Sequence, residues 1–141
     1  MKYLLSIIII SFIFSCKKPK IVTTSSGQGK ENFDTFFEKF KNDSVFQKQR
    51  IKYPFKMAFF EAELENPDIE YYNKDNITYL NLKYKEEFAK KEIDAYTQDV
   101  KFYKDTARIE LRGVDNGIFI DVDFIPINGI WFCIQLIDSS T

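Results

Sequence analysis

The segment IFIDVDFIPINGIWFCIQLID, residues 118–138, carries the clearest structural signal in this chain of 141 residues. Two apolar, β-branched runs flank Asn128-Gly129, and an Asn-Gly pair in that setting is the strongest short signal for a β-hairpin. With these two residues as the loop, the opposed pairs are Ile127 with Ile130, Phe124 with Cys133, and Val122 with Gln135. The sequence therefore predicts two long antiparallel strands joined by a tight turn.

The predicted hairpin has one apolar face, and the strand-like segment KFYKDTARIELRG, residues 101–113, extends it. The apolar face comprises Ile109, Leu111, Ile120, Val122, Phe124, Trp131, Cys133 and Ile137, with Gln135 as its polar exception. The opposite face comprises Arg108, Glu110, Arg112, Asp121, Asp123, Phe119, Phe132, Ile134 and Leu136. We expect a three-stranded meander with one face in the core.

Helices are predicted before this meander. NFDTFFEKF, residues 32–40, places four phenylalanines on one helical face, and Asn32 can cap the helix. A capping box at Ser44 predicts a second short helix that ends near residue 50. Residues 51–59 alternate as a strand does, and YKEEFAKKEIDAY, residues 84–96, fits a third helix.

These elements predict an α+β fold in which N-terminal helices pack on a curved, mainly antiparallel sheet that ends in the three-stranded meander. Residues 65–68, ENPD, are typical of a turn. The rest of residues 60–82 is not assigned, apart from a candidate short strand at NITYLNL, residues 76–82.

ENFDTFFEKFKNDSVFQKQRIKYPF, residues 31–55, resembles the opening of an uncharacterised family of Bacteroidota lipoproteins. The matching features are the phenylalanine stripe, Asp43, Phe46-Gln47 and Arg50-Ile51, and the terminal meander extends the resemblance over residues 31–141. The resemblance implies a nuclear-transport-factor-2-like fold, also called cystatin-like. It implies no activity, because the family has none to carry over.

The N-terminus predicts an export signal and a lipid anchor. Residues 3–14 form an apolar run of 12 residues, which suits a signal-peptide core and is too short for a membrane span. Ile13-Phe14-Ser15-Cys16 resembles a bacterial lipobox, so we expect a signal peptide over residues 1–15, lipidation of Cys16 and a flexible tether over residues 16–30. The basic KKPK that follows favours the periplasm-facing side of the outer membrane, because an acidic cluster commonly directs such lipoproteins to the cell surface.

Composition disfavours several functions. Without residues 1–15 the net charge is −2, which gives no positive field for nucleic acid. The absence of histidine excludes imidazole-based catalysis and His-built zinc sites. After lipidation of Cys16, Cys133 is the one remaining thiol, so no intramolecular disulfide is expected. Asp121 and Asp123 have no third ligand to complete a metal site, and no cofactor is implied.

Two candidate binding sites follow from the predicted faces. Tyr96, Phe124, Trp131 and Gln135 are candidates to line a concave pocket between helix and sheet, as folds of this type usually carry. The alternative is that Gln135 is bonded internally and Trp131 belongs to the core. On the opposite face, Arg108, Arg112, Asp121 and Asp123 could dock a protein, be solvated, or be covered by another copy in a homodimer.

Two tripeptides, residues 43–45 and 105–107, resemble the acceptor of Bacteroidota O-glycosylation, with Ser44 and Thr106 as the modified residues. Taken together, we expect a lipid-anchored, non-catalytic envelope protein that holds a small apolar ligand in the concave pocket. The alternative is a docking or scaffolding domain that binds an envelope protein. An enzyme is disfavoured, because no histidine exists and no carboxylate falls on the predicted concave strands.

Overall fold

The computed structural model describes residues 31–61 and 66–141, which form two short helices, one 3₁₀ turn and a six-stranded mixed sheet. The elements are α1 (Phe33–Phe40), α2 (Ser44–Gln49), β1 (Ile51–Phe59), β2 (Asp68–Tyr72), η1 (Glu86–Lys90), β3 (Tyr96–Tyr103), β4 (Thr106–Gly113), β5 (Phe119–Ile127) and β6 (Ile130–Asp138). The predicted signal peptide, Cys16 and tether lie outside the described residues. Among the described residues, no helix is long and apolar enough to cross a membrane.

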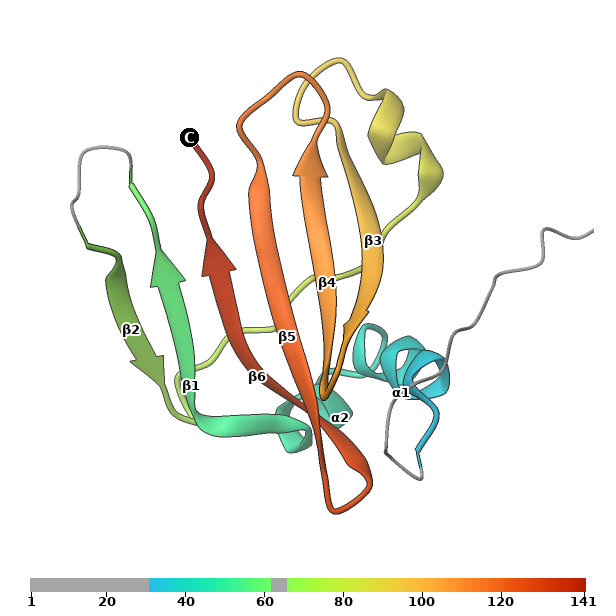
Figure 1. The fold of residues 1–141 in the computed structure, drawn as a ribbon, viewed down its shortest axis with the longest axis vertical. Coiled ribbons are helices and arrows are strands. Elements are labelled where there is room, and N and C mark those ends of the chain that lie inside the picture. Colours follow the sequence, from blue (N-terminus) through green and yellow to red (C-terminus); the bar gives the residue numbers. More distant parts are fainter. Residues whose placement is uncertain (1–30, 62–65) are drawn as a thin grey trace, which may run out of the picture.

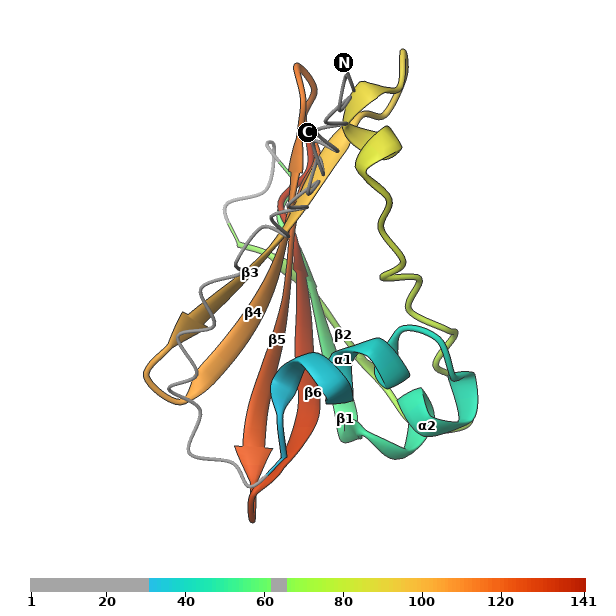
Figure 2. The same cartoon turned by 90° about the vertical axis from the view of Figure 1, so that its right-hand side faces the viewer.

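The strands lie in the order β2-β1-β6-β5-β4-β3 (Figure 1). The β1–β6 pair is parallel, and the other four pairs are antiparallel. Both α-helices lie on the same side of the sheet (Figure 2). We call the side that they cover the inner face and the opposite side the outer face.

The phenylalanine stripe forms α1, as predicted, and anchors it to the inner face. All four phenylalanines of the stripe are buried. Each stands edge-on to the ring of Phe124 on β5, with ring centroids 5.3–5.9 Å apart. Such edge-to-face pairs add to the free energy gained by burying the rings, so Phe124 is the centre of the core.

Both helices begin at a side-chain cap. The Asn32 Oδ1 accepts a hydrogen bond from the Thr35 N–H, which confirms the predicted cap of α1. The prediction for α2 was wrong by one residue, because Asp43, not Ser44, is the cap. Its carboxylate accepts bonds from the N–H groups of Val45 and Phe46, and so satisfies two N–H groups that the helix itself leaves unpaired.

A hydrogen-bonded clasp joins the start of the domain to β6. The Arg50 guanidinium donates to both carboxylate oxygens of Glu31 at 2.8 and 2.9 Å and to the Trp131 carbonyl at 2.9 Å. Trp131 donates its N–H to the same carboxylate and its indole N–H to the Glu31 carbonyl. Burial raises the pKa of Glu31, but the bonds from Arg50 and Trp131 outweigh it and leave that pKa below its ordinary value. The clasp therefore holds Glu31 ionised.

The predicted third helix is wrong over most of its length. Only the single 3₁₀ turn η1 forms, and Tyr96 begins strand β3. Residues 101–113 are not one strand but two, because Lys104-Asp105 closes a tight hairpin between Tyr103 and Thr106. The sheet therefore ends in four consecutive antiparallel strands, where three were predicted. The helix cannot continue to Tyr96, because Asp94 has a left-handed φ of 54°.

The unassigned region contributes an edge strand and part of the core. β2 pairs antiparallel with β1 and includes Asp68, which was expected in a turn. No strand forms at residues 76–82. Instead Ile77, Leu80 and Leu82 are buried in the core. The buried side chain of Gln47 holds this segment, since it accepts from the Leu80 N–H and donates to the Leu80 and Phe40 carbonyls.

A β-bulge in β6 changes the predicted register of the long hairpin. The pairs next to the turn are confirmed, including Phe124 with Cys133, but the register then shifts and Asp123 lies opposite Gln135. Ile134 is the extra residue, and a shift of one residue turns every later side chain to the other face. The β1–β6 pairing is irregular at the same place. Gln135 and Ile137 thus belong to the outer face, although they were predicted on the apolar face. Leu136 packs against the core, although it was predicted on the opposite face.

Candidate functional site

The four residues predicted to line a concave pocket do not come together. Phe124 and Trp131 are 0% and 2% exposed, because α1 lies directly over them. Gln135 is on the outer face, where its side chain bonds to Asp123. Tyr96 is half-buried and contacts the rings of Tyr84 and Phe88. Phe124 and Trp131 therefore have a core role, which for Trp131 was the stated alternative.

The second predicted set does come together, on the outer face of β4, β5 and β6. We call it the outer-face network, and its members are Arg108, Arg112, Asp121, Asp123 and Gln135. Arg108 binds both oxygens of Asp123, with Nε to Oδ1 at 2.7 Å and a terminal nitrogen to Oδ2 at 3.0 Å. Asp121 bridges the arginines, since it accepts from Arg108 at 3.0 Å and from Arg112 at 2.6 Å. Such two-pronged pairs fix both partners in orientation.

The strand register explains how the network assembles. Arg108 lies directly opposite Asp123, while Arg112 lies opposite Phe119 and reaches diagonally to Asp121. The Gln135 amide donates to Asp123 Oδ2 at 2.8 Å. The sequence placed Gln135 on the inner face, because the bulge that turns it to the outer face has no recognisable sequence pattern.

The carboxylates of the network lie beneath its guanidinium groups. The side chains of Asp121 and Asp123 are 9% and 4% exposed, whereas those of Arg108 and Arg112 are 28% and 27% exposed. The hydrogen bond to Asp123 raises the pKa of Arg108 above its ordinary value, although burial opposes this. A molecule that approaches this face therefore meets positive hydrogen-bond donors first.

Each arginine keeps donors in reserve. A guanidinium carries five N–H groups. Arg108 uses three of them for the two aspartates. Arg112 uses three as well, two for the carbonyls of Leu111 and Ile120 and one for Asp121. A terminal nitrogen of Arg112 also lies 3.6 Å from the Glu110 carboxylate. Within the described residues, Arg108 thus keeps two N–H groups and Arg112 keeps its Nε–H for an acceptor from outside.

Two exposed aromatic rings flank the arginines. The Arg112 guanidinium lies 3.6 Å from the centroid of the Phe119 ring, and that of Arg108 lies 5.6 Å from the Tyr103 ring. Phe119 is 45% and Tyr103 is 52% exposed. The Tyr103 hydroxyl also donates to Glu110, which holds the ring in place. The outer face thus combines fixed positive groups with accessible apolar rings.

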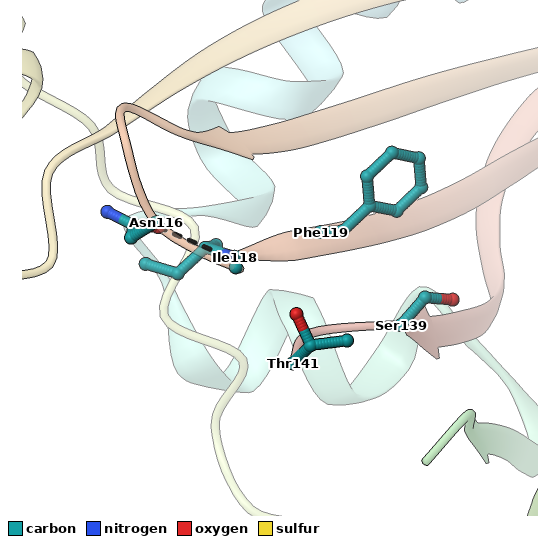
Figure 3. Close-up of a pocket in the computed structure, with 6 residues that line it drawn as sticks. Asn116, Ile118, Phe119, Ser139 and Thr141 are labelled. Carbon is teal, nitrogen blue, oxygen red and sulfur yellow. Dashed lines mark hydrogen bonds between the residues drawn. The ribbon is translucent and has the colours of Figure 1, made fainter. Parts of the chain in front are cut away.

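The surface around the network is hollowed. A cavity of about 340 Å³ is lined by Tyr103, Thr106, Arg108 and Asp123. A neighbouring cavity of about 320 Å³ is lined by Asp105, Thr106, Ile125, Pro126 and Gly129. A third, of about 370 Å³, lies at the Phe119 end, between the β4–β5 turn and residues 139–141 (Figure 3). The network is therefore bordered by recesses at both ends.

The remaining candidates are Cys133, metal-binding side chains and the two predicted glycosylation residues. Burial raises the pKa of the Cys133 thiol well above its ordinary value, so this cysteine is an apolar core residue, as expected. No cluster of metal-binding side chains occurs in residues 31–61 and 66–141. Of the two predicted glycosylation residues, Ser44 is exposed in the first turn of α2 and Thr106 is half-buried at the start of β4.

Solved structures with the same fold come from Bacteroides. A cystatin-like protein from Bacteroides caccae is 20% identical with a TM-score of 0.58, and the match covers 79% of this chain and 78% of that one. A protein from Bacteroides uniformis is 21% identical with a TM-score of 0.55, over 78% of each chain. An NTF2-like protein from Bacteroides fragilis is 19% identical with a TM-score of 0.55. That match covers 82% of this chain, which spans about half (49%) of the Bacteroides fragilis protein.

These matches define the class of fold as nuclear-transport-factor-2-like, also called cystatin-like, which confirms the resemblance drawn from residues 31–55. A family model, described only as "-like", matches residues 31–139. The chain therefore belongs to this uncharacterised family, which occurs in Bacteroides. A comparison with curated proteins finds no match.

Asp123 is the carboxylate on which the network depends, because it binds both Arg108 and Gln135. We predict that Asp123→Asn lowers the free energy of unfolding by about 2 kcal/mol, since it removes charge-assisted hydrogen bonds to a partly buried arginine. Urea unfolding followed by fluorescence of Trp131 measures the change. The control is Asp75→Asn, an exposed aspartate in the turn after β2, for which a change within about 0.5 kcal/mol is expected. Equal effects of the two substitutions would show that the network adds nothing to stability.

Proposed function

We propose that this protein is a lipid-anchored, non-catalytic docking domain of the cell envelope that binds a protein partner on its outer face. One observation carries the proposal: the guanidinium groups of Arg108 and Arg112 are held above buried carboxylates, with spare N–H donors and an exposed aromatic ring beside each. We infer that the partner presents carboxylates or backbone carbonyls, because these are the acceptors that the spare donors fit.

Preorganisation supports a binding role for this face. Free arginine side chains lose considerable conformational entropy when a partner immobilises them. Here the bonds to Asp121 and Asp123 have already fixed both guanidinium groups. Arginine and aromatic residues also dominate the binding energy of protein interfaces. The recesses beside Thr106 and Phe119 give a partner places to insert side chains.

The arrangement favours docking over the two other functions considered. A small apolar ligand has no pocket at Phe124 and Trp131, whose side chains are packed beneath α1. Catalysis needs a group that is free to accept or donate a proton. Both aspartates of the network are committed to arginines, and Cys133 is enclosed in the core.

The anchor belongs to the same proposal. A domain that begins at residue 31, behind the 15 residues 16–30 that comprise the lipidated Cys16 and the tether, would stay at the membrane while its outer face remains accessible. We propose the periplasm-facing side of the outer membrane as its location. A second copy of the chain, in place of another protein, is an outcome that the experiments below distinguish.

Lipidation is tested by feeding cells a labelled fatty acid. We expect the wild-type protein to carry the label and to lack residues 1–15, and the Cys16→Ser variant to carry none, because its thiol is the acceptor. Gel fluorescence and intact-mass spectrometry measure both properties. Cys133→Ser is the matched control and should keep the label. An unlabelled wild-type chain, or a labelled Cys16→Ser variant, would contradict the proposed anchor.

Docking is tested by photo-crosslinking in intact cells. A photoreactive amino acid in place of Phe119 should give a discrete adduct with another protein. The same amino acid in place of Val45, which is 66% exposed on α2, should give none. The paired exchange Arg112→Asp with Asp121→Arg keeps an ion pair but moves the guanidinium, so we expect it to reduce the Phe119 adduct several-fold.

Three results would contradict docking of a protein partner on the outer face. The adduct could persist unchanged in the exchanged variant, or Val45 could give the same adduct as Phe119. An adduct of twice the mass of the chain would assign the face to self-association instead.

A further inference from the structure

One edge of the sheet is formed by β3. β3 is the last strand of the sheet and, among the described residues, it pairs with β4 alone (Figure 1). Eight residues long, it leaves Asp99, Val100, Lys101 and Tyr103 exposed. A free strand edge offers unpaired backbone N–H and C=O groups to another chain.

The hydrogen-bond pattern identifies which residues face outward. The Val114 N–H donates to the Ala95 carbonyl, so Ala95 directs its backbone groups toward β4. In an antiparallel pair these directions alternate along the strand. Asp99 and Lys101 therefore direct their backbone groups toward β4, as Ala95 does. The alternate residues Gln98, Val100 and Phe102 direct their N–H and C=O groups to the free edge.

The charges of β3 are poorly matched within one copy. Asp99 lies directly opposite Glu110 on β4, and Lys101 lies directly opposite Arg108. Like charges at directly opposed positions destabilise a sheet. Neither Asp99 nor Lys101 has an ion-pair partner within the described residues. Both side chains are on the outer face, beside the free edge, where a neighbouring strand can reach them.

We propose that two copies pair antiparallel through β3, with Val100 at the two-fold axis. Outward-facing residues must pair with each other, so symmetric pairing near the middle of the strand can centre only on Asp99, Val100 or Lys101. Centring on Asp99 or Lys101 opposes identical charges. Centring on Val100 places Asp99 of each copy opposite Lys101 of the other. The outward-facing N–H and C=O groups of Gln98, Val100 and Phe102 then gain hydrogen-bond partners in the second copy.

This pairing makes one sheet from two domains and sets their outer faces side by side. It goes beyond the docking proposal and does not depend on it, because it uses the edge of β3 and not the outer-face network. A lysine at a strand edge ordinarily discourages pairing. Here Lys101 and Asp99 permit one register and oppose the two neighbouring ones, so the edge selects a defined dimer over open-ended association.

A cysteine at the axis tests the pairing. Opposed residues that exchange backbone hydrogen bonds have Cα atoms about 5.5 Å apart, which a disulfide can bridge. In the full chain in its own membranes, Val100→Cys should give a disulfide-linked dimer after mild oxidation, seen on a non-reducing gel. Val45→Cys on α2 is the control and should give none, although Val45 is 66% exposed and Val100 only 40%.

Charge exchange tests the register. Adding Asp99→Lys to the Val100→Cys chain opposes two lysines across each pair and should reduce the dimer several-fold. Adding Lys101→Asp as well restores opposite charges and should restore the dimer. Both changes also relieve the like charges against Glu110 and Arg108, so the domain should remain folded.

Three outcomes would overturn the dimer. Val100→Cys could give no disulfide, Val45→Cys could give as much, or the disulfide could be insensitive to the charge changes. The dimer is read from a disulfide at residue 100 and docking from a photo-adduct at residue 119, so either proposal can fail while the other holds.

Discussion

The contact between Phe124 and the four phenylalanines of α1 holds the rest of the domain in place. α1 is only eight residues long, and isolated helices of that length are unstable in water. Its stability therefore comes from the rings that it buries against the inner face of β5. The clasp of Glu31, Arg50 and Trp131 fixes the helix at its N-terminal end, so the start of the domain is tied to the centre of the sheet.

The next residue along β5 organises the other face. Successive side chains of a strand point to opposite sides, so Asp123 lies behind Phe124 and collects Arg108 and Gln135. The bulge at Ile134 makes this possible, because it turns Gln135 outward and allows Leu136 to join the core. One irregularity in β6 thus removes a polar group from the apolar side and completes the charged side, where the proposed docking surface lies.

Local patterns predicted the elements that short-range chemistry determines. The spacing of the phenylalanines gave α1, and Asn128-Gly129 gave the hairpin turn and the pairs beside it, including Phe124 with Cys133. Strand alternation placed Arg108, Arg112, Asp121 and Asp123 on one face, where the structure brings them together. The bulge could not be predicted, because it depends on β6 pairing with β1 and β5 at once. The β3–β4 hairpin was missed because Lys104-Asp105 lacks the glycine that marks such turns, and the charged residues before it favoured a helix.

The central claim is that the bulge brings Gln135 into the outer-face network. The most direct test is to locate the Gln135 side-chain amide by nuclear Overhauser effects in isotopically labelled protein. The structure predicts contacts from this amide to the β-protons of Asp123 and the side chain of Lys56, its neighbour on β1. Contacts from the amide to the rings of Phe124 or Trp131 would place Gln135 on the inner face. That result would contradict the bulge, the completed network and the docking surface built on it.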